Sequence, residues 1–302
     1  MTEAVSSSPC SSTAIVVTYN RKALLVQCIE ALLKQTVPCR ILVVDNASTD
    51  NTREAIESYI ESGTIEYFRM EKNIGGAGGF NFGLKTAANE GFKYLWAMDD
   101  DCLPTPDALE QLLSFAKEHP DFGFLSSKVL WTDGSICRMN EPKLLEGSFN
   151  DDKPRRCRQA SFVSFFTQTS TLEKHGLPIS DFFIWGDDVE YTRRISAIDP
   201  SWYVPASVVV HHTASNTGSD ISKDSLERLG RYRFAYRNEV YIAREEGFSR
   251  RMYQLAKILY HTGRVLFLSP DHKGERIRMI WSSSKEGLSF SPKREEFHAP
   301  GH

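Results

Sequence analysis

The sequence lacks the features that would anchor a protein in a membrane or crosslink it. No apolar run approaches the ~20 residues that a membrane-spanning helix needs. Residues 1–12 are polar and serine-rich, without the basic and apolar regions of a signal peptide. Six cysteines are scattered through 302 residues with no CxxC pair and no zinc-ligand spacing, which favours reduced thiols. We therefore expect a cytoplasmic protein, either free in solution or peripheral at the inner face of the cell membrane.

An excess of charge of one sign is also missing. The formal net charge of −3 argues against a nucleic-acid partner and against an acidic tail. A hydrophobic content of 41% and a charged content of 25% are typical of a globular chain. The length of 302 residues leaves room for one large domain, or for a domain with an appendage.

The first ~120 residues alternate between strand-like and helix-like patterns. Short apolar runs rich in β-branched or aromatic residues are each followed by a polar turn and an amphipathic stretch. The four runs are Ala14–Thr18, Ile41–Val44, Ile65–Phe68 and Tyr94–Met98. This alternation predicts an α/β fold with a mainly parallel central sheet and helices on both faces. Asn20 is expected to cap the first helix, and Thr105 with Pro106 to open the one after the fourth strand.

The second half is less regular. Further strands are predicted at 122–131, 161–166 and 202–210, with a mobile polar loop at 141–159. From about Ser222 to Ser282 the pattern is helical, and the tail from Ser283 reads as loosely structured.

Three adjacent carboxylates, Asp99, Asp100 and Asp101, follow the fourth strand. Like charges at the edge of a core repel one another and cost desolvation energy, and a divalent cation would remove that cost. Carboxylate oxygens suit Mg²⁺ or Mn²⁺, and ligands of open α/β sheets bind at the carboxyl ends of strands. The structural alternative is an acidic turn that caps the next helix.

Polar residues also end the other strands of the first half. Tyr19-Asn20-Arg21 follows the first, Asp45 the second, and Asn73 with a glycine cluster at 75–79 the third. In a parallel sheet these ends lie on one edge, so the groups would converge on one crevice. The glycines allow close backbone approach to phosphates, although alone they are more often a turn. Their spacing is neither a Walker loop nor the dinucleotide fingerprint.

These motifs, taken in order, resemble the inverting glycosyltransferases of family 2, which have the GT-A fold. The matching pieces are Val16-Val17-Thr18-Tyr19-Asn20-Arg21, Val43-Val44-Asp45-Asn46-Ala47-Ser48-Thr49-Asp50, Asn73-Ile74-Gly75-Gly76 and Asp99-Asp100-Asp101. The resemblance covers roughly residues 13 to 242. It implies a catalytic domain at 13–220, a helical region at 221–302 and a disordered start at 1–12.

The resemblance implies a nucleotide-sugar donor and a metal cofactor, Mn²⁺ or Mg²⁺. The metal would be held by Asp99 and Asp101. Donor contacts are expected at Thr18, Tyr19, Asn20, Arg21, Asp45, Asn73, Gly75, Gly76, Asp99 and Asp100. The glycine motif followed by Met-Asp-Asp-Asp is most similar to galactofuranosyltransferases, which use UDP-galactofuranose. Rhamnosyltransferases that use dTDP-rhamnose share much of the pattern.

A second acidic group follows Trp185 in the stretch Trp185-Gly186-Asp187-Asp188-Val189-Glu190-Tyr191. Inverting sugar transfer needs a base that takes the proton of the acceptor hydroxyl, and a carboxylate can do this. The family pattern places the base at Asp188, with Trp185, Asp187 and Glu190 as acceptor contacts. The structural alternatives are a solvated helix start for the acids and a core position for Trp185. Gly186 stands where some relatives have no residue, which weakens the assignment of Trp185 more than that of Asp188.

The third group is His211-His212, at the end of the last predicted strand. The family pattern makes His211 a metal ligand, a ligand type that Mn²⁺ accepts. Because side chains alternate along a strand, one histidine of the pair is expected to face the site.

The C-terminal region leaves two questions open. Arg237 and Asn238 either face the site or anchor their helix. Residues Met252, Leu255, Leu259 and Leu266 form an apolar face in a basic segment, which either packs on the catalytic domain or lies on a membrane surface. The expected function is transfer of a sugar to a hydroxyl of a glycan or lipid-linked glycan acceptor in cell-surface glycan synthesis. A non-catalytic nucleotide-sugar or glycan-binding module is the alternative from another class.

Overall fold

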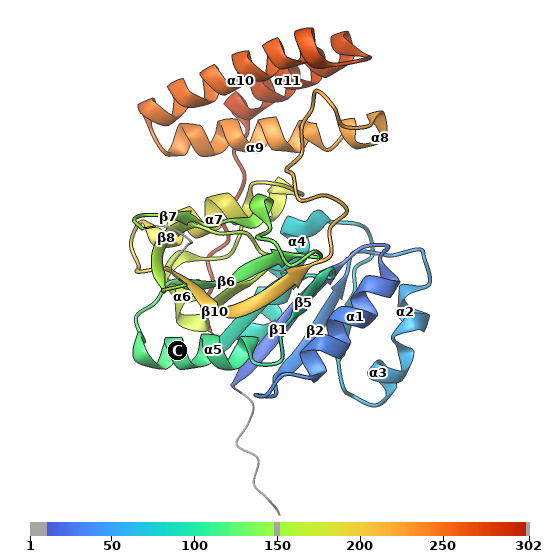
Figure 1. Cartoon of the computed structure of the whole chain (residues 1–302), viewed down its shortest axis with the longest axis vertical. Helices are drawn as coiled ribbons and strands as arrows, with labels where there is room; N and C mark the ends of the chain where they lie inside the picture. Colours follow the sequence, from blue (N-terminus) through green and yellow to red (C-terminus); the bar gives the residue numbers. More distant parts are fainter. Residues whose placement is uncertain (1–10, 148–151, 300–302) are drawn as a thin grey trace, which may run out of the picture.

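The computed structural model describes residues 11–147 and 152–299 (Figure 1). Most of the predicted disordered start lies outside these ranges, but Ser12 already belongs to the first strand. Within the described ranges, no helix is both long and apolar enough to cross a membrane.

Ten strands form one mixed sheet in the order β3-β2-β1-β4-β9-β6-β10-β8-β7, and β5 pairs with β10. The strands are β1 Ser12–Thr18, β2 Arg40–Asp45, β3 Glu66–Arg69, β4 Tyr94–Asp99, β5 Cys102–Pro104, β6 Phe124–Trp131, β7 Lys143–Leu144, β8 Arg155–Gln159, β9 Phe165–Gln168 and β10 Trp202–His211. Strands β1 to β4 are parallel, as is the pair β6 and β10. Strand β9 joins the two parallel groups by pairing antiparallel with β4 and β6.

Helices cover both faces of the sheet (Figure 1). They are α1 Lys22–Leu33, α2 Thr52–Ala55, α3 Glu57–Glu61, α4 Gly75–Asn89, α5 Ala108–Glu118, α6 Thr169–His175 and α7 Asp187–Ser196, with 3₁₀ turns η1 Arg138–Asn140 and η3 Ser180–Phe182. The period of two along β1 sends Ala14 and Val16 into one core with α1 and α5, and Ile15 and Val17 into another with α4. The predicted GT-A-type layering, a sheet between two layers of helices, is confirmed.

Two predicted helix starts are wrong, and in both the expected capping side chain has another partner. The residue before α1 is Arg21, and the Asn20 side chain instead accepts a hydrogen bond from the backbone N–H of Thr49. Helix α5 begins at Ala108 after Asp107, because the Thr105 hydroxyl bonds back to the side chain of Asp107 and to β10.

The stretch 141–159, predicted as a mobile loop, contains β7 and β8, although 148–151 lie outside the described residues. Strand β8 was missed because it is basic and only Cys157 is buried, so it shows no apolar alternation. It is held by antiparallel pairing with the start of β10.

The tail predicted as loose from Ser283 is also ordered over its described part. Helix α11 continues to Ser289, and Phe297 is buried in the core that contains Leu172 and Leu177. The carbonyl of Glu295 accepts a hydrogen bond from the backbone N–H of Leu177.

Four helices form a separate layer at one end of the molecule (Figure 1). They are α8 Leu226–Leu229, α9 Tyr232–Glu245, α10 Phe248–Leu268 and α11 Lys273–Ser289. Their shared core includes Tyr236, Val240, Ile258, Val265 and Ile280. Helix α9 lies between the outer helices and the loop that precedes α7, so this layer packs over that loop (Figure 1).

Candidate active site

The acidic triplet lies in the tight turn between β4 and β5. Asp100 and Asp101 are buried, whereas Asp99, at the end of β4, is partly buried. The Thr18 hydroxyl, at the end of β1, donates to Asp100 Oδ2 at 2.6 Å. Arg21 Nη1 donates to Asp101 Oδ2 at 2.5 Å and to Asp100 Oδ1 at 3.3 Å. The turns after β1 and β4 therefore share one charged cluster, as predicted.

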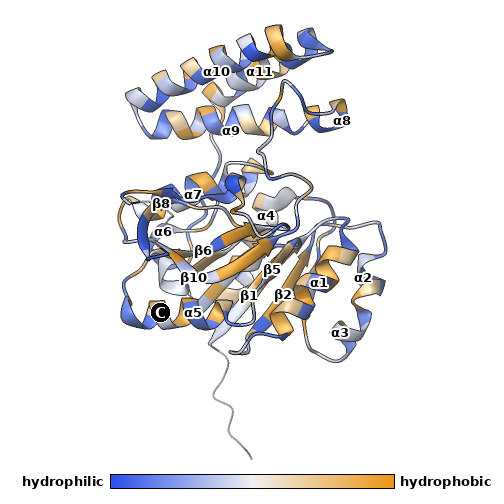
Figure 2. Ribbon diagram, viewed as in Figure 1, coloured by the Kyte–Doolittle hydropathy of each residue, from blue (hydrophilic) through white to orange (hydrophobic). Residues whose placement is uncertain are grey.

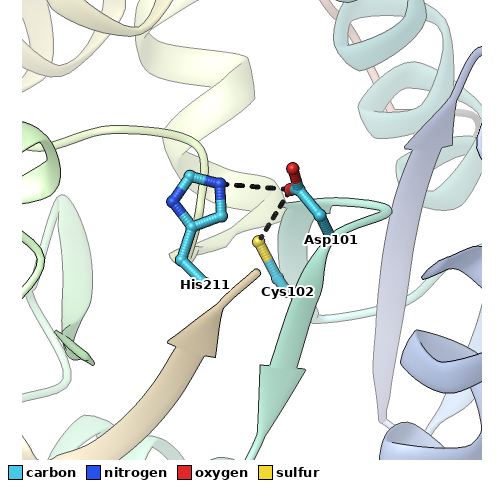
Figure 3. Close-up of side chains that lie close together, drawn as sticks. All are labelled: Asp101, Cys102 and His211. Atoms are coloured by element: carbon cyan, nitrogen blue, oxygen red, sulfur yellow. Dashed lines mark hydrogen bonds and ion pairs between the residues drawn. The ribbon is translucent and has the colours of Figure 1, made fainter. Parts of the chain in front are cut away.

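His211, at the end of β10, completes this cluster (Figure 3). Its Nε2 lies 3.2 Å from Asp101 Oδ1, and both side chains are buried. Its Nδ1 donates to Asn140 Oδ1 at 2.8 Å, and the Asn140 amide is oriented by donating to the Ser161 hydroxyl. That bond directs Nε2 at the carboxylate. Neighbouring His212 contributes its backbone N–H to the carbonyl of Asp101.

The charges of this cluster perturb one another. Burial, with the charge of Asp101, raises the pKa of Asp99 to about 8. Burial opposes ionisation of Asp101 as well, but its hydrogen bond to His211 and the charge of Arg21 bring its pKa below the usual value. Burial would lower the pKa of His211, yet the bond to Asp101 raises it overall. These directions favour an ion pair between His211 and Asp101, beside a carboxyl group of Asp99 that resists ionisation.

This donor set fits a hard divalent cation. Asp101, Cys102 and His211 offer ligand atoms that all lie within 4.8 Å of one another, and Asp99 adds a second carboxylate at the same turn (Figure 3). Carboxylate and imidazole together suit Mn²⁺, and a cation would remove the repulsion that raises the pKa of Asp99. Burial raises the pKa of the Cys102 thiol, so this sulfur is a protonated thiol beside the carboxylates rather than a ligand.

The remaining donor-side residues line the same edge of the sheet. Asp45 is buried and accepts hydrogen bonds from the Ser48 N–H and the Tyr67 hydroxyl. Asn73 Oδ1 accepts the N–H of Gly75, which opens α4. Tyr19 is exposed and Gly76 has open space beside its Cα. Both carboxylate oxygens of Asp45 thus have hydrogen-bond partners within the protein. In the first turn of α4, by contrast, the space beside Gly76 is open.

The glycine cluster is a contact point with the second acidic group. Gly75 has φ +75°, and a Cβ there would lie 2.0 Å from the carbonyl oxygen of Phe183. That carbonyl accepts the N–H of Ala77 in the first turn of α4. The site therefore needs glycine at 75 to let the loop before α7 approach the start of α4.

This loop, residues 183–186, has an unusual backbone. Phe183 and Trp185 have φ of 66° and 64°, and Gly186 has φ of 93°. The side-chain amide of Asn238 donates hydrogen bonds of 2.7–3.3 Å to three backbone carbonyls in and next to this loop. They are the carbonyls of Phe182, Ile184 and Trp185. Arg237 Nη2 adds a bond to the carbonyl of Asp181. Arg237 and Asn238 therefore anchor the loop rather than face a ligand.

The acids that follow this loop differ in exposure. Asp187 is buried and Asp188 is partly buried, both in the first turn of α7. Burial raises the pKa of Asp187 to about 8 and that of Asp188 to about 6. Glu190 is buried, and Arg194 donates a hydrogen bond to each of its carboxylate oxygens. The negative charge of Glu190 is therefore already balanced within the protein and does not need a bound sugar acceptor. Trp185 packs edge-on against Tyr232 of α9.

The structure thus brings Thr18, Arg21, Asp100, Asp101 and His211 into direct contact. It links the loop of Trp185, Asp187 and Asp188 to the same sheet edge through Gly75. Sequence reasoning missed Asn140, which orients His211, since it stands in the short turn η1 outside every motif.

Comparison with known proteins shows the family of the N-terminal segment. Residues 13–141 match the model of glycosyl transferase family 2. This segment is a family 2 glycosyltransferase domain. The galactofuranosyltransferase GlfT1 of Mycolicibacterium smegmatis is 27% identical over 205 residues, which cover 60% of this chain and 64% of that protein. GlfT1 of Mycobacterium tuberculosis is 27% identical over 318 residues, covering 95% of this chain and 97% of that protein.

The fold of this glycosyltransferase is found among solved structures. GalNAc-T7, crystallised with UDP, GalNAc and Mn²⁺, superposes with a TM-score of 0.64 at 15% identity, over 92% of this chain and 55% of that chain. At this identity the likeness concerns the fold, which is the GT-A fold predicted from the motifs.

Proposed function

We propose that this glycosyltransferase is a metal-dependent inverting enzyme that moves galactofuranose from UDP-galactofuranose to a hydroxyl of a glycan or lipid-linked glycan. The choice of sugar is supported by the two GlfT1 relatives, which are galactofuranosyltransferases. Cytoplasmic action in cell-surface glycan synthesis belongs to the same proposal. Transfer of rhamnose from dTDP-rhamnose is the other donor to be tested. The observation that carries the proposal is the contact of Asp101 with His211 at one edge of the sheet. The side chains of Thr18 and Arg21 bind the same acidic turn.

At the donor end, Asp99, Asp101 and His211 would hold Mn²⁺ or Mg²⁺. When bound, such a cation neutralises charge that builds on a leaving diphosphate. Arg21 is half-exposed and lies beside the acids, so its guanidinium can turn from them toward a phosphate. Thr18 keeps Asp100 in place, and the first turn of α4 leaves open space beside Gly76 for a close backbone approach.

At the acceptor end, Asp188 is the proposed base. It is the more accessible of the two adjacent acids, and a raised pKa makes a carboxylate a stronger proton acceptor. Asp187 is buried with a pKa raised above neutrality, so it would orient the acceptor as a neutral acid. Trp185 is held beside them by Tyr232 and offers a ring for a sugar face.

The test compares Asp188→Asn with Asp187→Asn. If Asp188 is the base, its replacement should lower the transfer rate by about 10³-fold, within the range of general base catalysis. Because Asp187 is largely protonated near neutrality, asparagine imitates it, and Asp187→Asn should lose far less. Calorimetry should show that UDP binding with Mn²⁺ is kept in both variants. Full activity of Asp188→Asn would remove this residue from the mechanism.

Two further measurements separate the alternatives. Release of UDP or dTDP from a panel of nucleotide sugars identifies the donor. A protein that binds UDP with Mn²⁺ but releases nucleotide from no donor, even with acceptor glycans present, would be a binding module.

A further inference from the structure

Helix α10 carries its most apolar face on the outside of the molecule. Nine of the seventeen large hydrophobic side chains that are exposed in the described residues lie on this helix. Phe248, Met252, Leu255, Leu259 and Leu266 follow one another at spacings of four, three, four and seven residues, so they form one continuous stripe. Phe267 lies beside it and is 85% exposed. This stripe, with Phe267, is called the outer face.

The opposite face of α10 packs against α9 and is the more polar of the two faces. Gln254 donates to Glu239 of α9, and His261 bonds to the Tyr236 hydroxyl at 2.7 Å. Ile258 and Val265 are the buried apolar side chains of this face. The usual order of a surface helix is therefore inverted, since ordinary helices bury the apolar side. An exposed apolar patch of this extent marks a surface that binds something.

The residues at the borders of the outer face indicate the partner. The segment 248–268 contains four lysines and arginines and no acid. Tyr253 and Tyr260 lie along one border, with Arg250 and Arg264 stacked over their rings. Arg251, on the other border, donates to the carbonyl of Arg244 and so keeps its full charge. A helix that lies in the interface of a bilayer typically has an apolar centre, tyrosines along its border and basic residues at its rim, and α10 has all three.

Charge argues against a second copy on this face. A two-fold pairing of α10 helices would bring the Arg251 of both copies to one interface, where α10 offers no acid to pair with them. Three rim cations are already partnered within the chain, Arg250 with Glu246, Lys257 with Glu239 and Arg264 with Asp220. Arg251 remains a net positive charge that an anionic headgroup can neutralise.

We propose that the outer face of α10 docks the enzyme on an anionic lipid surface. Helix α10 belongs to the outermost layer in Figure 1, and Figure 2 shows apolar segments along this helix. The loop that immediately precedes Asp187 and Asp188 lies beneath α9 of the same layer. Docking in this way keeps the active site close to the bilayer while α9 separates the two. The proposal does not rest on the identity of the sugar donor.

The test is cosedimentation of the full chain with vesicles, without donor or acceptor. The protein should bind vesicles of mixed phosphatidylcholine and phosphatidylglycerol, and bind pure phosphatidylcholine more weakly. Leu259→Gln with Leu266→Gln, at positions 53% and 49% exposed, should weaken binding about tenfold or more. The matched control is Leu33→Gln with Ile198→Gln, which changes two similarly exposed apolar residues elsewhere and should leave binding unchanged. Arg251→Gln should weaken binding to the anionic vesicles alone, by about fivefold.

Thermal unfolding should be alike in all four proteins, since the changed side chains are exposed. Absence of vesicle binding in the unchanged protein would overturn the proposal, as would full binding by the double leucine variant. Light scattering gives the third outcome. A dimer that becomes a monomer in the double leucine variant, without vesicle binding, would assign the face to a second copy instead.

Discussion

Asn238 is the residue through which the helical layer should control the geometry of the proposed base. Its amide is fully buried and donates to carbonyls of Phe182, Ile184 and Trp185, immediately before Asp187 and Asp188. Replacement by alanine removes these donors and leaves buried carbonyls unsatisfied. We expect Asn238→Ala to lower both the stability of the fold and the rate of transfer.

The magnitude follows from two opposing terms. Two non-glycine residues in the left-handed region, Phe183 and Trp185, cost roughly 1–2 kcal/mol each. Each buried carbonyl that loses its partner costs about 1–3 kcal/mol, and the two N–H groups of one amide serve the loop. The loss is therefore about 2–6 kcal/mol before the loop relaxes, comparable to the strain of roughly 2–4 kcal/mol that these bonds offset. The loop should relax, and a displacement of about 1 Å at the base can lower the rate about 100-fold.

The assay must separate positioning from general destabilisation. Turnover is measured well below the unfolding temperature, with kcat and the donor KM determined separately. We expect Asn238→Ala to lower kcat by about 10- to 100-fold and to change the donor KM little, since the donor contacts lie on other elements. Asn89→Ala is the matched control, because Asn89 is exposed at the end of α4 and alanine suits a helix. If Asn238→Ala is destabilised but turns over normally, the loop holds its shape unaided and the reasoning fails.

Two further predictions concern the proposed metal ligand and base. Asn140→Leu removes the acceptor that orients His211, so titration with Mn²⁺ should show affinity reduced about 10- to 100-fold while UDP binding without metal is unchanged; unchanged Mn²⁺ affinity would contradict the role of Asn140. Burial raises the pKa of Asp188 to about 6, and a base acts only when deprotonated, so kcat/KM should rise with pH through about 6 and then level off. A pH profile that is flat between 5 and 7 (roughly one unit either side of that pKa) would count against Asp188.

The sheet of the first half could be predicted because its physics is local. Strands β1, β2 and β4 are apolar runs that are largely buried, and each is followed by polar residues, so the sequence pattern alone marks both the strand and the edge of the sheet where it ends. Strand β8 could not be found this way, since its basic residues are ordered by pairing with β10. The C-terminal tail escaped prediction because partners distant in sequence hold it: Phe297 lies in the core that contains Leu172, and the carbonyl of Glu295 accepts a hydrogen bond from Leu177.

In the candidate site, too, the residues at strand ends could be predicted from sequence and the others could not. Asp101 and His211 could be paired from sequence because each lies at or just after the end of a strand. Alternation along β10 predicted that one histidine of the pair faces the acids, and the family pattern selected His211, which contacts Asp101. Asn140 carries no such signal. The choice between packing and exposure for the apolar face of α10 depends on which face meets α9, and polar bonds of Gln254 and His261 decide that.

The anchoring of the loop also bears on how the chain divides into parts. A boundary near residue 220, which stays a prediction, would separate Asn238 from the carbonyls it holds. Those acceptors are backbone atoms, so no side-chain pattern in 182–185 reveals them, and the left-handed residues cannot be read from the types Phe and Trp. Because the same layer presents α10 outward and Asn238 inward, it joins the proposed lipid surface to the proposed base. The helical layer is then a structural part of the candidate active site, and a chain cut at 220 should keep the predicted donor contacts while losing the side chain that holds the loop before Asp188.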